Sequence, residues 1–157
     1  GVRLRVAGNG PELVDSEAIV RTRNLDVQFL GGISHQGVTD FLNESVGLVF
    51  PSKALEGAPL IYGEALSAGL PVIAAENSTL ATQVRLDGTG SIFSLGSDES
   101  LFEALNHVNL RRAEMSARAL EIFLDRYDSR TWVKRISDIY DNVIRTYEHT
   151  PKDMRDS

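Results

Sequence analysis

Residues 50–71 read FPSKALEGAPLIYGEALSAGLP, and this stretch decides the fold because it joins two apolar strands through a helix. It starts at the end of the apolar run Gly47–Phe50 and turns through Glu56-Gly57. A helix is predicted next, with Pro59 in its first turn, where the missing N–H costs nothing. Gly69 is predicted as the C′ residue that ends this helix before the following strand. A unit of strand, helix and strand predicts a parallel sheet.

The sequence on either side repeats this alternation of short apolar runs and helix-length segments. Most of the runs are continuous rather than alternating, which is typical of strands buried on both faces. The five predicted strands are Leu4–Ala7, Val27–Leu30, Gly47–Phe50, Pro71–Ala75 and Ser91–Leu95. We therefore predict an α/β fold, a Rossmann-like doubly wound parallel sheet with C-terminal helices.

The C-terminal third is predicted to be helical. Ser97 or Asp98 caps one helix, and a second carries apolar positions at three-and-four spacing over Ala113–Tyr127. The last helix follows Asp128-Ser129 and bears a broad apolar stripe, whose aromatic rings are expected to pack in a core. The stripe consists of Trp132, Ile136, Ile139, Tyr140, Val143 and Tyr147. The polar tail, residues 150–157, is expected to fray.

Composition limits the class of protein. The chain has 157 residues, 42% of them hydrophobic and 24% charged, which suits one globular domain over residues 1–149. A net charge of −6 argues against a nucleic-acid partner, because binding a phosphate backbone needs a basic face. The sequence has no run of 18 or more apolar residues, so no integral membrane segment is predicted. The absence of cysteine excludes a thiolate metal site, and His35, His107 and His149 are too scattered to form a metal site.

A ligand site is predicted where the helix after Gly57 begins. This point follows the C-terminal end of a strand, the edge at which open α/β sheets bind ligands. Free N–H groups and the positive end of the helix dipole suit a diphosphate there, and Gly57 allows a close backbone approach.

Two carboxylates accompany this helix. Glu64 lies within the otherwise uncharged run 57–75, where a carboxylate is costly unless donors satisfy it. Glu56 precedes it by eight residues, about two helical turns, so both can face one pocket. Either residue alone suits a structural role, Glu56 as an N-cap and Glu64 as an acceptor for a neighbouring loop. Their combination at a strand end favours a ligand site.

The pattern PSxxxEGxPLxxxEALxxGLPVIA over residues 51–74 resembles the hallmark of the family 4 (group 1) glycosyltransferases. LRVAGNGP at 4–11 is similar to the family's strand and glycine turn, and VQFLG at 27–31 to its next strand and turn. Ser34-His35 and DGTG at 87–90 also resemble family positions. The resemblance covers roughly residues 3 to 149.

This resemblance implies one lobe of a GT-B fold, the C-terminal lobe that holds a nucleotide-sugar donor. The acceptor lobe would be a missing N-terminal part of the same protein, and the last helix would pack toward it, leaving its stripe partly exposed here. The implied enzyme is a hexosyltransferase-like retaining glycosyltransferase that needs no metal and no cofactor beyond its nucleotide-diphosphate sugar. This fragment alone is expected to be inactive.

Site residues follow from the motif positions. The resemblance implies that Glu56 is the catalytic residue and accepts hydrogen bonds from the transferred sugar, while Glu64 binds the ribose hydroxyls. The other implied donor-binding residues are Gly57, Ala58, Leu60, Lys53, Gly10 and Ile33. The first three act through backbone N–H groups, and the last two lie in loops near the base. Lys53 is a weak substitute for a basic pair that the family places before Leu4, and a solvated lysine is the alternative.

Two departures from the family pattern leave questions open. If Leu4–Ala7 is the family's second strand, the central strand of the order 3-2-1-4-5-6 is absent. We expect a preceding segment, another chain or a closing of the gap to supply the missing ladder partners. A complete sheet built from this chain alone would contradict that hypothesis. STLAT at 78–82 replaces the family's Gly-Gly and Pro-Glu, which leaves donor specificity open.

Two other classes of function compete with a transferase. A non-catalytic nucleotide- or sugar-binding module of the same fold is the main alternative. A receiver or flavodoxin-like module would need an acidic cluster or a flavin loop at the strand ends, and the sequence shows neither. We expect a cytoplasmic protein; peripheral attachment at the inner membrane face is a further option, for which the sequence offers no basic amphipathic helix.

Overall fold

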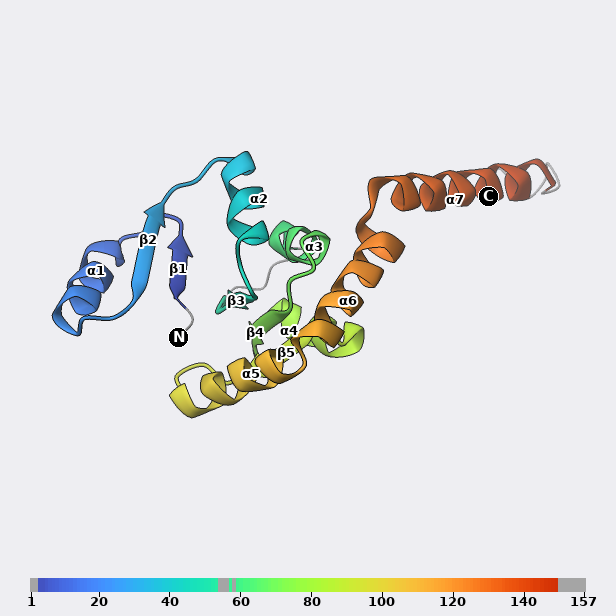
Figure 1. Cartoon of the computed structure of the whole chain (residues 1–157). Coiled ribbons are helices and arrows are strands. Elements are labelled where there is room, and N and C mark those ends of the chain that lie inside the picture. Colours follow the sequence, from blue (N-terminus) through green and yellow to red (C-terminus); the bar gives the residue numbers. More distant parts are fainter. Residues whose placement is uncertain (1–2, 54–56, 58, 150–157) are drawn as a thin grey trace. The chain divides into compact units, whose positions relative to one another are not determined.

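The computed structural model describes residues 3–53, 57 and 59–149, and the chain divides into two compact units, residues 1–44 and 45–157. In both units every described strand runs parallel to its neighbour, and helices connect successive strands (Figure 1). The predicted α/β class is therefore confirmed.

The first unit is a β-α-β-α arrangement. Its elements are β1 (Leu4–Ala7), α1 (Leu13–Thr22), β2 (Val27–Gly31) and α2 (His35–Asn43). Strands β1 and β2 form a two-stranded parallel sheet. Ser34 caps α2, its Oγ accepting from the Gly37 N–H at 3.1 Å. The Arg5 guanidinium joins β1 to the end of α2, donating to the Phe41 carbonyl and the Glu44 carboxylate at 2.8 Å each.

The second unit holds a three-stranded parallel sheet of order β3-β4-β5. Its elements are β3 (Leu48–Phe50), α3 (Leu60–Ser67), β4 (Val72–Ala75), α4 (Thr79–Asp87), β5 (Gly90–Phe93), α5 (Asp98–Leu110), α6 (Arg112–Ile122), the π-helix η1 (Phe123–Tyr127) and α7 (Ser129–His149). Every residue of the central strand β4 is buried. Gly90 lies opposite Val72 so closely that a Cβ would collide with the Val72 backbone, which requires glycine at the start of β5.

Apolar side chains from sheet and helices form the core of the second unit. One cluster joins β4 and β5 to α5 and α6 through Ile73, Ala75, Phe93, Ala104, Val108 and Met115. Helix α3 contributes the fully buried Ala65 and Leu66. Burial of such side chains is the main stabilising contribution to a fold of this size.

All five predicted strands are present, with ends that differ by two residues or fewer from the apolar runs. Within the described residues these strands pair as two parallel sheets, one in each unit. β1 is hydrogen-bonded only to β2, and β3 only to β4, within the part of the chain described. That another segment supplies the missing ladder partners stays a prediction.

The C-terminal helices also differ from expectation in two respects. The helix predicted to reach Tyr127 changes from α6 to η1, where the Asp128 N–H bonds to the Phe123 carbonyl at 2.9 Å, a five-residue spacing. The stripe of α7 is exposed: Trp132 by 56%, Tyr140 by 65% and Tyr147 by 58%. The prediction that these rings pack in a core was wrong, because periodicity shows only that a helix has an apolar face and not what covers it. The exposure agrees instead with the partly exposed stripe that the family resemblance implied.

No described helix combines the length and the apolar character that crossing a bilayer would require.

Candidate functional site

Helix α3 begins at the surface, in the segment that follows β3. Pro59 is its N-cap, with a ψ of 116°, so it stands just before the first turn and not within it as predicted. Among the described residues no side chain caps this end, and the Leu60 side chain is 83% exposed. In the first turn the Tyr62 N–H bonds to the Pro59 carbonyl at 3.1 Å. The N–H groups of Leu60 and Ile61 have no acceptor within the helix and, with the positive end of the helix dipole, suit an anionic ligand.

The other end of α3 is closed by glycine. Gly69 has a φ of +65°, the left-handed conformation expected of a C′ residue, and confirms its predicted role. The Leu70 N–H returns to the Ala65 carbonyl at 2.9 Å. From α6, the Ser116 hydroxyl donates to the Gly69 carbonyl at 2.7 Å. This end of α3 is thereby held against α6.

Glu64 is a half-buried carboxylate in the middle of α3. Tyr62 and Ala65 on the same helix are buried to 1% and 0% exposure. A carboxylate is an acceptor only, so one partly withdrawn from water on a helix with no other charged residue suits hydroxyl or N–H donors of a ligand.

The structure locates part of the predicted site. Leu60 and Glu64 lie on one helix, and Lys53 and Gly57 are exposed in the segment before it. A Cβ at Gly57 would meet no atom within 4 Å, so the space around it is open. Glu56 and Ala58 lie outside the described residues.

The predicted base-binding loops belong to the first unit. Gly10 is exposed and Ile33 is half-buried. That they join Leu60 and Glu64 in one site stays a prediction. His35 is the first residue of α2, and Ser34 is its cap.

A buried polar network, which the sequence did not predict, connects α3 to the end of α4. The Asp87 side chain is fully buried and accepts from Tyr62 Oη at 2.9 Å, Gln83 Nε2 at 2.7 Å and Arg126 Nη1 at 2.6 Å. Thr89 Oγ1 lies 2.8 Å from the Tyr62 oxygen and donates to it, since the phenol proton goes to Asp87. Burial above all, and the Asp87 carboxylate besides, raise the pKa of Tyr62 well above its usual range, so its phenol stays neutral.

One local signal could have revealed this network. Asp87 is the last residue of α4, where the negative end of the helix dipole disfavours a carboxylate. An aspartate in that position calls for compensating donors or a cation.

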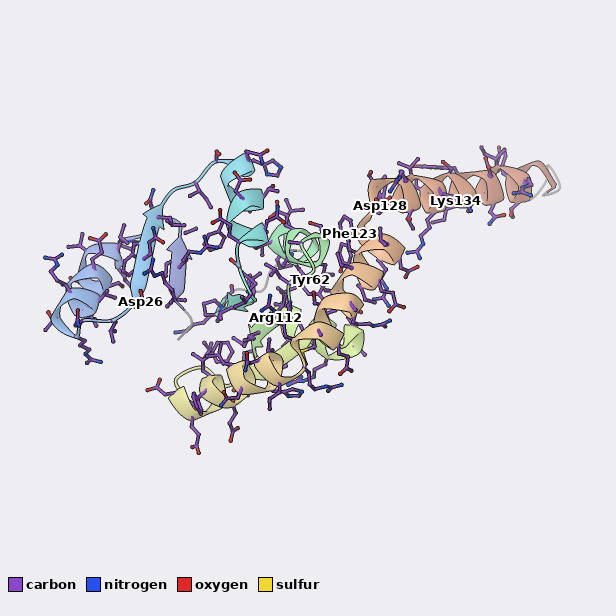
Figure 2. The ribbon with its side chains drawn as sticks, in the orientation of Figure 1. Asp26, Tyr62, Arg112, Phe123, Asp128 and Lys134 are labelled. Atoms are coloured by element: carbon purple, nitrogen blue, oxygen red, sulfur yellow. The ribbon has the colours of Figure 1, made fainter. Side chains whose placement is uncertain are left out.

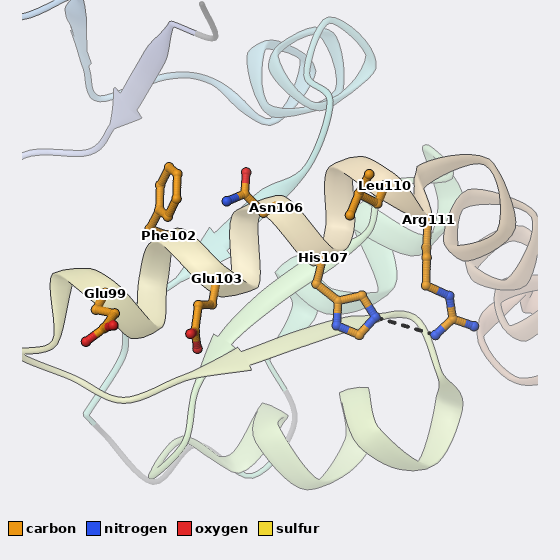
Figure 3. Close-up of a pocket in the computed structure, with 7 residues that line it drawn as sticks. All are labelled: Glu99, Phe102, Glu103, Asn106, His107, Leu110 and Arg111. Atoms are coloured by element: carbon orange, nitrogen blue, oxygen red, sulfur yellow. Dashed lines mark hydrogen bonds between the residues drawn. The ribbon is translucent and has the colours of Figure 1, made fainter.

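A surface depression on α5 does not qualify as a site. The residues that line it are Glu99, Phe102, Glu103, Asn106, His107, Leu110 and Arg111 (Figure 3). All of them come from one helix and the residue that follows it, so no second element faces them. Across the described ranges, no group of three or more His, Asp or Glu residues is arranged to hold a metal ion.

Comparison with solved structures defines the fold class as GT-B. HepE from Anabaena, in complex with UDP, matches with a TM-score of 0.74 and 20% identity over 90% of this chain and 41% of that chain. Sucrose-phosphate synthase from Thermosynechococcus elongatus gives 0.69 and 20% over 92% and 39%. WaaG, a glycosyltransferase involved in lipopolysaccharide biosynthesis, gives 0.63 and 23% over 87% and 37%. The chain thus spans well under half the length of these structures.

The family is identified by the sequence itself. Residues 1–121 match the family described as Glycosyl transferases group 1, and the chain belongs to it. No curated protein sequence matches the chain.

Proposed function

We propose that this chain is the C-terminal, donor-binding lobe of a retaining family 4 glycosyltransferase. The enzyme moves a hexosyl group from a nucleotide-diphosphate sugar to an acceptor. The observation that carries this proposal is α3, whose one charged residue is the half-buried Glu64, one turn after an N-terminus that no described side chain caps and at which Leu60 is exposed. Membership in the group 1 family supports it.

The diphosphate is assigned to the N-terminus of α3. The chain carries a net charge of −6, so an anion must be held by local dipoles rather than by the overall field. Free N–H groups and the helix dipole provide such a site. Negative charge grows on the diphosphate as it leaves, so the same groups stabilise the transition state more than the bound donor. This stabilisation needs no metal.

The two carboxylates bind different hydroxyl groups of the donor. Glu64 accepts from the ribose, and Glu56 accepts from the transferred sugar at the reacting end. Gly57, Ala58 and Leu60 face the diphosphate through their N–H groups, and the loops of Gly10 and Ile33 lie near the base. HepE, which shares the fold, has been solved in complex with UDP and with UDP-glucose, which supports a donor of this type.

We assign the exposed stripe of α7 as the surface on which the acceptor lobe packs. Ile139 is 56% exposed and Val143 60%, next to the exposed aromatic rings of the same helix. An apolar face of this extent on a monomer indicates a surface that another part of the protein covers. We place the enzyme in the cytoplasm, where nucleotide sugars would reach it.

Calorimetric titration of the full-length protein tests donor binding directly. Three forms of the protein are titrated: wild type, Glu64→Ala and the control Glu103→Ala. The ligands are UDP, GDP and ADP and the conjugates UDP-glucose, GDP-mannose and ADP-glucose. Glu103 is an exposed glutamate on α5. We expect selective binding of one base, weakened about tenfold or more in Glu64→Ala because hydrogen bonds to a charged group are lost. Equal affinity in both variants would refute the assignment of Glu64.

A transfer assay separates the enzyme from a non-catalytic module. With the selected donor, the full-length protein should release nucleoside diphosphate in the presence of EDTA. Glu56→Ala should lower kcat more than it changes KM, since its contacts strengthen at the reacting sugar. Tight donor binding without release of product by the wild type would favour the binding module.

A further inference from the structure

Tyr62 connects α3 to a buried charge. It is the third residue of α3 and lies two positions before Glu64. Its hydroxyl is bonded both to the Asp87 carboxylate and to Thr89, so the position of the ring is fixed at its far end. Because a side chain held at both ends constrains the backbone that bears it, these bonds set the rotation of the first turn of α3.

The π-helix η1 holds the same turn from a second side. The Tyr127 ring meets the Tyr62 ring edge-on, with centroids 5.9 Å apart and planes at 83°. A Cβ built on Gly63 would stand 3.3 Å from Tyr127 Cδ1, so this glycine permits the close approach. Figure 2 shows Tyr62 on α3 and Phe123 at the start of η1.

Arg126 supplies the cation for this arrangement. Its Nη1 donates to Asp87 Oδ1, while Tyr62 donates to Oδ2, so the two groups occupy different oxygens of one carboxylate. The Asp87 side chain is 0% exposed and the Arg126 side chain 42%. A buried carboxylate that loses its cation is strongly destabilised, so the ion pair with Arg126 stabilises Asp87 in the position where it accepts from Tyr62.

We propose that Tyr62, Asp87 and Arg126 are positioning residues that fix the donor-binding end of α3. The ligand assigned to α3 rests on the proposed function, and none of the three residues is assigned a contact with it. They act through the backbone of α3, which carries the N–H groups and Glu64. Small displacements of such groups reduce binding sharply, because the donors no longer point at the charge that they stabilise.

The chain offers a matched control at the opposite end of the same helix. Ser116 forms one hydrogen bond to the Gly69 carbonyl, and Tyr62 forms its bond to Asp87 near the start. Ser116→Ala and Tyr62→Phe each remove a hydroxyl that donates to another element. A purely structural role predicts that both variants affect stability and that neither affects donor binding.

The test uses the full-length protein in five forms: wild type, Tyr62→Phe, Arg126→Met, Arg126→Lys and Ser116→Ala. The probe is whichever of UDP-glucose, GDP-mannose or ADP-glucose the wild type binds most tightly. We expect Tyr62→Phe to weaken binding about tenfold and Ser116→Ala less than about twofold, since only the first removes a bond to a charged group at the donor end. Arg126→Met should weaken binding at least as much as Tyr62→Phe, with partial recovery in Arg126→Lys. Folded Tyr62→Phe and Arg126→Met proteins with wild-type affinity would overturn the proposal.

Hydrogen exchange distinguishes this proposal from the proposed function. In the same variants without ligand, Tyr62→Phe should accelerate exchange of the amides of residues 64–67, because their helical hydrogen bonds end at the carbonyls of the first turn of α3, and Ser116→Ala should not. If the wild type binds none of the three probes, the proposed function fails, and exchange still decides whether the positioning residues act on α3. Unchanged exchange in Tyr62→Phe would overturn the positioning role by itself.

Discussion

The Asp87 carboxylate occupies a position that would be unfavourable on its own. It is buried at the C-terminal end of α4, where the helix dipole is negative. Three donors from three elements compensate for the lost water, and one of them, Arg126, is a cation. An accompanying bond from Arg118 Nε to the Asp87 carbonyl, at 2.9 Å, satisfies the helix end as well. The residue therefore joins α3, α4, α6 and η1 at one point.

Tyr62 makes this network sensitive to alkaline pH. Its pKa is raised from the usual value of 10.0, mainly by burial. A group whose pKa is raised on folding contributes its full stability below the unfolded pKa, and this contribution falls as pH rises beyond it. We expect the free energy of unfolding to fall between pH 8 and pH 11, and to fall less in Tyr62→Phe.

Urea unfolding at the two pH values measures this effect. Tyr140→Phe serves as the control, since Tyr140 is 65% exposed on α7. Lysine side chains also titrate in this pH range, so the free energy of unfolding changes with pH in every form of the protein. The test is therefore the difference in that change between Tyr62→Phe and Tyr140→Phe. The same decrease in both would show that Tyr62 is not the group responsible.

At the scale of the element, α3 is the part that the sequence predicts best. Gly69 ends it as predicted, and the structure starts it one residue after Pro59, which was predicted within its first turn. α7 shows the limit of the same reasoning. Its apolar spacing predicts a long helix correctly. Whether the apolar side chains are exposed depends on which other part of the protein packs against them, and the spacing carries no information on that.

Equal truncations on these two helices should have unequal effects. Leu66→Ala on α3 should lower the free energy of unfolding of the 157-residue chain by about 2–5 kcal/mol, because Leu66 is 0% exposed. Val143→Ala on α7, at 60% exposure, should change it by less than about 0.5 kcal/mol. Urea unfolding followed by circular dichroism measures both. A loss of several kcal/mol in Val143→Ala would mean that the stripe is covered, for example by a second copy.

At the scale of the whole molecule, the two sheets leave strand edges without described partners. β3 and β5 are the outer strands of one sheet, and β1 and β2 form the other. The apolar runs predicted all five strands, but an apolar run does not indicate which other strand it pairs with. The bonds of Asp87 show the same limit, since Tyr62 precedes it by 25 residues and Arg126 follows it by 39.

Strand pairing predicts a gradient of hydrogen exchange. β4 is bonded on both sides and fully buried, so its amides should exchange slowest in the 157-residue chain. Amides of β1 and β3 that point away from their single partners should exchange much faster. Exchange followed by NMR or mass spectrometry resolves the strands. Protection of β3 equal to that of β4 would show that another strand covers its outer edge.

The five-residue turn of η1 has a consequence for evolutionary comparison. A π turn has one residue more than the α-helical turn it replaces, so it is equivalent to a single insertion. The family match ends at residue 121, two positions before η1 begins. Relatives with an ordinary α-helical turn here would be one residue shorter, and an ungapped alignment would assign their residues to the wrong partners of Asp87 and Tyr62. A one-residue gap within Phe123–Tyr127 restores the correspondence.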